Sequence, residues 1–225
     1  SPELIVVAAY GRLLPREILE LPAKGCINVH SSLLPKYRGA APINWAVLNG
    51  EEETGVTIMY MAQELDAGDI IAQASTPIDP EETVESVHDR LLVQTVSRLE
   101  AGTAERTPQD GERATYAPML SRELSPIDWT RPAREIHDQI RGLIPWPASS
   151  TDLLGAGVVK VFGGRETGES TSRRPGTILS ADKRGIRVAC GDGKVLCLTE
   201  LQAPGSRRMS AADYLRGHPV SAEED

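Results

Sequence analysis

The sequence predicts an α/β fold in its first half, followed by a small antiparallel β-domain. Strand-like apolar runs alternate with helix-like patterns up to residue 100, which is typical of mixed α/β proteins. Short β-rich runs separated by Gly, Asp and Pro dominate from residue 158 onwards, which favours a small barrel or sandwich. The 225 residues suffice for one large domain or two ordinary ones, and 40% hydrophobic residues can supply a buried core.

Strands and helices alternate in the first half. We expect strands at residues 4–9, 25–30, 55–61 and 70–73, and helices at residues 41–49 and 82–100. Gly50 ends the first helix, because glycine readily adopts the left-handed conformation that closes a helix. The second helix carries one apolar stripe formed by Val84, Val87, Leu91 and Leu92.

The first expected strand follows directly on Ser1-Pro2-Glu3. Residues 4–9 are continuously apolar, as in a strand that is buried on both faces of a sheet. Such a strand needs flanking elements, and none precedes it in this sequence. We therefore expect that upstream sequence is missing and that the sheet is incomplete at its N-terminus.

Residues 102–117 are predicted to be an interdomain linker, because they are rich in Gly, Thr, Pro and charge and lack apolar periodicity. The expected domains are therefore residues 1–101 and 118–225. The second domain should contain a helix at 132–143 with Pro132 at its start. Its expected strands are 158–162, 176–179, 185–189 and 194–201, followed by a short helix at 211–215.

Charge is unevenly distributed along the chain. The formal net charge is −8, but residues 1–109 hold 8 basic and 16 acidic side chains, whereas residues 121–218 hold 15 basic and 11 acidic ones. The second half therefore carries a net charge of +4, and a nucleic-acid partner stays open for it.

Other function classes are disfavoured. No apolar run approaches the length of a membrane span, and the three cysteines form no CxxC pair, so we expect a soluble cytoplasmic protein without disulfides. No two histidines have the spacing of metal ligands, so we expect no metal.

The strongest chemical feature is Asn28-Val29-His30, with Asp66 in a loop some thirty-six residues later. Side chains two apart on a strand share a face, so Asn28 and His30 project together. An amide can donate to a developing oxyanion, an imidazole can exchange protons, and a carboxylate can orient the imidazole and favour its charged form. This trio suits acyl transfer, although by itself the pattern is weak and a purely structural role stays open.

The surrounding residues strengthen this interpretation. Asn28-x-His30-x-Ser-Leu-Leu-Pro-x-Tyr-Arg-Gly, followed by Leu65-Asp66-x-Gly-Asp, resembles the signature of enzymes that transfer formyl from 10-formyltetrahydrofolate. The resemblance implies a Rossmann-like sheet in which Asn28, His30 and Asp66 are catalytic, without a metal. It also implies folate contacts, which would come from Ser32, Leu33, Leu34, Pro35, Arg12, Leu13, Leu14, Gln63 and Leu65.

Some of these residues have a second interpretation. Leu13 and Leu14 would also pass as core residues. Lys36 and Arg38 flank the motif, where they could either meet an anionic substrate or simply lie on the surface.

The second half bears on the formyl acceptor. Ser125-Pro-Ile-Asp-Trp129 and Arg208-Met-Ser-Ala-Ala-Asp-Tyr-Leu-Arg-Gly217 resemble segments of the tRNA-acting members of this family. The resemblance implies an OB-like barrel and transfer of formyl to the amino group of methionyl initiator tRNA, for translation initiation. We expect a monomer with no obligate protein partner. The alternatives are a sugar-nucleotide N-formyltransferase and a truncated tRNA-binding fragment without turnover.

Overall fold

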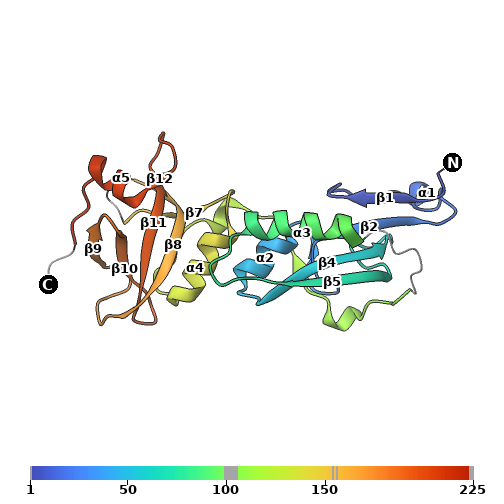
Figure 1. Ribbon diagram of the computed structural model, residues 1–225, viewed down its shortest axis with the longest axis horizontal. Coiled ribbons are helices and arrows are strands. Elements are labelled where there is room, and N and C mark those ends of the chain that lie inside the picture. Colours follow the sequence, from blue (N-terminus) through green and yellow to red (C-terminus); the bar gives the residue numbers. More distant parts are fainter. Residues whose placement is uncertain (1, 99–105, 154, 156, 223–225) are drawn as a thin grey trace. The chain divides into compact units, whose positions relative to one another are not determined.

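The computed structural model describes residues 2–98, 106–153, 155 and 157–222, with side chains left out at 92–98. The chain divides into two compact units. Unit 1 comprises Ser1–Ala46, Glu51–Pro80 and Ser86–Met119, and unit 2 comprises Val47–Gly50, Glu81–Glu85 and Leu120–Asp225. The predicted order, an α/β part followed by an antiparallel β-domain, is confirmed (Figure 1).

Unit 1 is built on a mixed sheet with the strand order β1-β2-β4-β5. Its strands are β1 (Ile5–Ala8), β2 (Cys26–His30), β4 (Glu53–Tyr60) and β5 (Ile70–Pro77). Strand β2 runs parallel to β1 and antiparallel to β4, and β4 runs antiparallel to β5. Strand β2 is an inner strand of this sheet, and its last residue, His30, pairs with Thr57 of β4.

Three α-helices accompany this part of the chain. They are α1 (Arg16–Leu19), α2 (Pro42–Leu48) and α3 (Val84–Arg98). Helix α2 begins at a proline, which has no N–H to leave unpaired in a first turn, and is followed by Gly50 at a φ of +66°. On α3 the predicted stripe residues Val84, Val87 and Leu91 are buried. The side chain of Leu92 and the predicted helical residues 99–100 lie outside the described residues.

The described part of the predicted linker contacts the sheet. Thr107 forms two backbone hydrogen bonds with Ile70. After the short 3-10 helix η1 (Gly111–Arg113), strand β6 (Tyr116–Ala117) pairs in parallel with β3 (Arg38–Gly39). Residues 106–117 therefore lie within unit 1. The domain bounds 1–101, 102–117 and 118–225 stay predictions.

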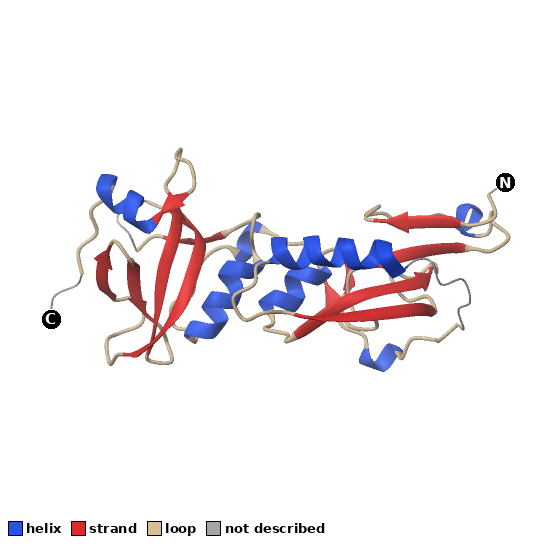
Figure 2. Cartoon of the chain, viewed as in Figure 1, coloured by secondary structure: helices blue, strands red, loops and turns tan. Residues whose placement is uncertain are grey.

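Unit 2 is an antiparallel sheet with the order β7-β8-β11-β10-β9, and β12 pairs with β11. Its strands are β7 (Ser149–Thr151), β8 (Val159–Ser170), β9 (Ile178–Asp182), β10 (Gly185–Ala189), β11 (Lys194–Gln202) and β12 (Met209–Ser210). Its helices are η2 (Arg122–Leu124), α4 (Ala133–Gly142) and α5 (Ala211–Gly217) (Figure 2). Strand β8 is longer than the predicted run at 158–162, because its second half continues through Gly, Arg and Glu residues that lack the apolar pattern.

The core of unit 2 forms where α4 and α5 pack on the sheet. Ile136 and Ile140 of α4, Leu198 of β11 and Tyr214 of α5 are almost completely buried in one apolar cluster. Ser210 caps the N-terminus of helix α5, because its hydroxyl accepts a hydrogen bond from the Asp213 amide.

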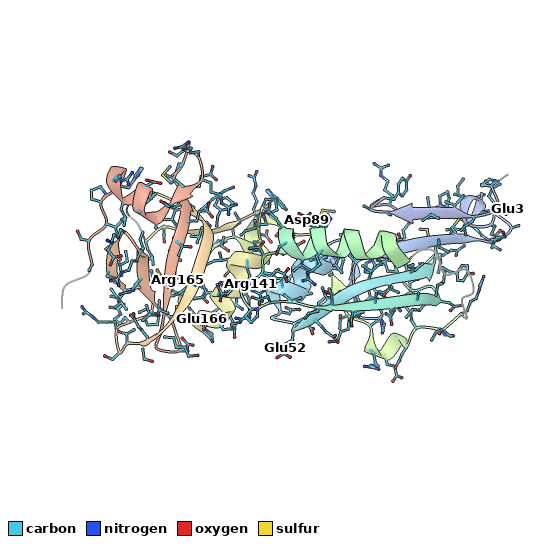
Figure 3. All side chains as sticks on the ribbon, viewed as in Figure 1. Glu3, Glu52, Asp89, Arg141, Arg165 and Glu166 are labelled. Carbon is cyan, nitrogen blue, oxygen red and sulfur yellow. The ribbon has the colours of Figure 1, made fainter. Side chains whose placement is uncertain are left out.

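Helix α4 also buries charge. Asp138 accepts from Arg141 at 2.8 Å and lies 3.2 Å from Arg134, which is also 3.5 Å from Glu166 on β8. Figure 3 labels Arg141 on α4 and Glu166 on β8.

Within the described residues, every helix is too short or too polar to span a bilayer.

Candidate active site

His30 is the last residue of β2 and is only 6% exposed. Its Nε2 lies 2.8 Å from the carbonyl oxygen of Tyr37, and its Nδ1 lies 3.6 Å from Oδ2 of Asp66. A carbonyl oxygen only accepts hydrogen bonds, so Nε2 carries the proton in this contact. Nδ1, which faces the carboxylate, is then the nitrogen that is free to gain or lose a proton.

Asp66 lies in the loop between β4 and β5, and its backbone adopts a left-handed φ of +49°. Aspartate tolerates this conformation better than most residues. Its Oδ2 accepts a hydrogen bond of 2.9 Å from the amide of Gly39. The carboxylate is thereby held beside His30, although the two residues are far apart in the sequence.

Asn28 precedes His30 by two positions on β2, opposite Val7 of β1 and Met59 of β4. The alternation of a strand places Asn28 and His30 on the same face of the sheet. The structure therefore brings an imidazole and a carboxylate into proximity, with an amide on the same strand face.

Residues 32–35 form a tightly held loop after β2. The hydroxyl of Ser32 donates to the Lys36 carbonyl, and the Leu34 amide donates to the hydroxyl of Thr57. The amide of Gln73 donates to the Leu34 carbonyl at 2.8 Å.

One side of this loop borders a pocket of about 400 Å³. The pocket is lined by Leu33, Leu34, Pro35, Lys36, Tyr37, Glu51, Glu53, Thr54, Gln73 and Arg113, a set that does not include Asn28, His30 or Asp66.

The other predicted folate contacts lie on loops at the surface. Arg12 and Leu13 are exposed between β1 and α1, and Leu13 is 59% exposed, so the interpretation of Leu13 as a core residue is wrong. Leu14 is partly buried. Gln63 and Leu65 are exposed in the loop between β4 and β5, which also carries Asp66.

The interpretation of Arg38 as a surface residue is wrong, whereas contact with an anionic substrate stays a prediction. Arg38 is only 4% exposed, and its guanidinium donates to Glu64 at 3.3 Å and to Oε1 of Gln109 at 2.9 and 3.1 Å. Lys36 keeps a half-exposed side chain that pairs with Glu51 at 3.3 Å.

Sequence reasoning missed Gln109 and Thr115, because both lie in the segment predicted to be a linker. Gln109 donates to the carbonyls of Asp66 and Gly68, each at 2.8 Å. The hydroxyl of Thr115 accepts from the Tyr37 amide, and its carbonyl accepts from the Arg38 amide. No apolar periodicity marks these residues, so the sequence contains no local signal that would have singled them out.

A metal is not suggested by the donor groups. Across the described ranges, no three His, Cys, Asp or Glu side chains gather in a way that would hold a metal ion.

A mixed sheet that presents Asn-x-His at the end of an inner strand, with an aspartate from the next loop beside the imidazole, fits an enzyme of acyl transfer. Residues 1–100 match the model of the formyl transferase family, and residues 119–219 match that of the formyl transferase C-terminal domain. The chain belongs to the formyl transferase family.

Two curated relatives match almost the whole chain. It is 51% identical to the methionyl-tRNA formyltransferase of Moorella thermoacetica, with 98% of this chain and 72% of the relative covered. It is 45% identical to the methionyl-tRNA formyltransferase of Bacillus subtilis, with 99% of this chain and 72% of the relative covered.

Solved structures of lower identity share the fold. HypX from Aquifex aeolicus in complex with tetrahydrofolic acid matches with a TM-score of 0.70 at 22% identity, covering 100% of this chain and 40% of the HypX chain. The N-formyltransferase from Helicobacter canadensis in complex with folinic acid and dTDP-3-aminofucose matches with a TM-score of 0.61 at 23% identity, covering 79% of this chain and 65% of that one.

Proposed function

We propose that this chain transfers the formyl group of 10-formyltetrahydrofolate to the amino group of methionine on initiator tRNA. The observation that carries the proposal is the similarity to methionyl-tRNA formyltransferases, which extends over both units at about half identity. The match to a sugar N-formyltransferase rests on the fold alone and covers 79% of the chain. The tRNA is therefore favoured over an amino sugar as the acceptor.

In the proposed reaction, the methionyl amine attacks the formyl carbon carried on N10 of the folate. A C–N bond forms to the amine, the C–N10 bond breaks, and the proton lost by the amine ends on N10. Asn28 is proposed to donate a hydrogen bond to the oxyanion of the tetrahedral intermediate. The Nδ1 atom of His30 is proposed to carry the proton, because Nε2 is engaged by the Tyr37 carbonyl.

Asp66 is proposed to stabilise the imidazolium form of His30. The distance of 3.6 Å between His30 Nδ1 and Asp66 Oδ2 supports this role, since a carboxylate this close can orient the ring. The hydrogen bond from the Gly39 amide restricts the carboxylate, so it stays oriented as the ring gains and loses its proton.

The folate is proposed to contact two groups of residues. The first is the loop of Ser32, Leu33, Leu34 and Pro35, which follows His30 directly and is held by Thr57 and Gln73. The second is formed by Arg12, Leu13, Leu14, Gln63 and Leu65. Most of these lie on exposed loops, where a ligand has access to them.

The tRNA is proposed to contact unit 2, whose residues 121–218 are net positive in an otherwise acidic chain. Phosphate contacts need local positive charge, whatever the net charge of the whole protein. We further propose that the chain acts as a cytoplasmic monomer.

The test is formyl transfer measured in parallel on charged initiator tRNA and on amino-sugar nucleotides, with labelled 10-formyltetrahydrofolate. We expect labelled formyl-methionyl-tRNA, and no transfer by a His30→Ala variant that keeps the circular dichroism spectrum of the parent. Labelled sugar as the main product would establish the sugar alternative. Tight tRNA binding without any transfer would establish the fragment alternative.

A further inference from the structure

We propose that Gln109 is a positioning residue, which sets the carboxylate of Asp66 against His30. This inference rests on the proposed function. Gln109 touches neither imidazole nor carboxylate in the described contacts. It acts through the backbone of the loop that carries Asp66 and through Arg38 in the loop that binds the same carboxylate.

The first arm of the Gln109 contacts reaches the loop that carries Asp66. The amide group of Gln109 donates two hydrogen bonds of 2.8 Å, one to the carbonyl of Asp66 and one to the carbonyl of Gly68. These two carbonyls lie on either side of Ala67, directly after the turn at residues 65–66 in which Asp66 adopts its left-handed backbone conformation. One side chain thereby holds the backbone at Asp66 and at Gly68, and the direction in which the Asp66 side chain leaves the backbone depends on these two contacts.

The second arm is the loop of residues 37–39. The Oε1 atom of Gln109 accepts two hydrogen bonds from the guanidinium of the buried Arg38. The next residue, Gly39, donates its amide to Asp66 Oδ2, and the preceding residue, Tyr37, offers its carbonyl to His30 Nε2. Gln109 therefore ties together the two loops whose groups meet at the His30–Asp66 pair.

The hydrogen-bonding capacity of a primary amide matches this position. A carboxamide supplies two N–H donors and a carbonyl acceptor, and here the donors face carbonyl oxygens while the acceptor faces a cation. Glutamate at this position would keep the acceptor for Arg38 but would turn an anionic oxygen towards two carbonyls. The Gln109→Glu substitution therefore removes the Asp66 arm and leaves the Arg38 arm in place.

The first measurement is amide hydrogen exchange, which needs no turnover. The Gly39 amide reports directly on Asp66, because its acceptor is the Asp66 carboxylate. We expect Gln109→Glu to lower the protection of the Gly39 amide by about tenfold or more, which is the size expected for losing a hydrogen bond to a charged carboxylate. Protection of amides in the pairing of β4 with β5 should be unchanged.

The matched control is Gln202→Glu in unit 2. Gln202 also donates its side-chain amide to a backbone carbonyl, that of Ser206, at 2.8 Å. This control should leave Gly39 protection at its parental value. Unchanged Gly39 protection in Gln109→Glu would overturn the inference, whether or not the chain transfers formyl.

The second measurement is a double-mutant cycle on kcat for formyl transfer. We expect Gln109→Glu to lower kcat by about 10- to 100-fold with little change in KM, as for a catalytic group displaced by about 1 Å. In the Asp66→Asn background the same substitution should cost less than about twofold, because there is no carboxylate left to position. Equal losses in both backgrounds would show a merely structural role, whereas absence of transfer by the parent chain would refute the proposed function instead.

Discussion

A methyl group added at Gly68 should disable the site more than it destabilises the protein. A Cβ atom built on Gly68 would lie 1.8 Å from the carbonyl oxygen of Tyr60, whereas real Cβ atoms stay beyond about 3.0 Å. The Cβ atom is fixed to the backbone of Gly68 and meets the backbone of Tyr60, so no side-chain rotation can relieve the contact. In Gly68→Ala the loop must therefore move by about 1 Å or more.

The size of the effect follows from that displacement. Asp66 is two residues away on the same loop, and its carboxylate is already 3.6 Å from His30. Because a misplacement of about 1 Å can cost about 100-fold in rate, we expect kcat to fall by about two orders of magnitude. Forcing a methyl group into a filled space typically costs about 1–3 kcal/mol, which should lower the thermal unfolding temperature without preventing folding.

The assay is the initial rate of formyl transfer to charged initiator tRNA, measured together with thermal unfolding. Gly111→Ala is the matched control, because a Cβ atom at Gly111 meets nothing within 4 Å. This control should keep both rate and unfolding temperature. A Gly68→Ala variant with parental kcat would refute the claim that the position of this loop sets the activity.

Four further outcomes are expected. Asp66→Asn should lower kcat by at least about 100-fold, and an unchanged rate would remove Asp66 from the mechanism. Burial lowers the pKa of His137, despite an opposing attraction from Glu81. The folded chain therefore binds a proton at His137 less well than the unfolded chain does. The unfolding temperature should therefore fall as the pH drops below about 6.5, and His137→Gln should flatten that decrease; identical profiles would contradict this. Burial raises the pKa of Cys190 to about 11, and all three cysteines are buried as free thiols. The native chain should therefore react only slowly with a thiol reagent at pH 8, and all three thiols should react once the chain is unfolded. Leu198→Ala should cost about 2–5 kcal/mol in urea unfolding, since Leu198 is completely buried, and a loss below 1 kcal/mol would contradict the assigned core.

The sequence by itself determined those features that depend on neighbouring residues. Strand alternation put Asn28 and His30 on one face, and the apolar stripe of the helix that follows Glu82 predicted its buried side. Both periodicities come from backbone geometry within a few residues. The order of an α/β part and an antiparallel β-domain followed from the same local patterns.

Only the tertiary structure decided what surrounds the His30–Asp66 pair. It buried Arg38 against Gln109, where the charge of Arg38 had predicted a surface or ligand-binding role, and it packed residues 106–117 against the sheet as part of unit 1. Two further hydrogen bonds around this pair, from the Gly39 amide to Asp66 and from the Tyr37 amide to Thr115, join backbone groups to side chains that are 27 and 78 residues away. Hydrogen bonds of this kind impose no periodicity on the sequence, because each depends on where distant loops meet after the sheet has formed.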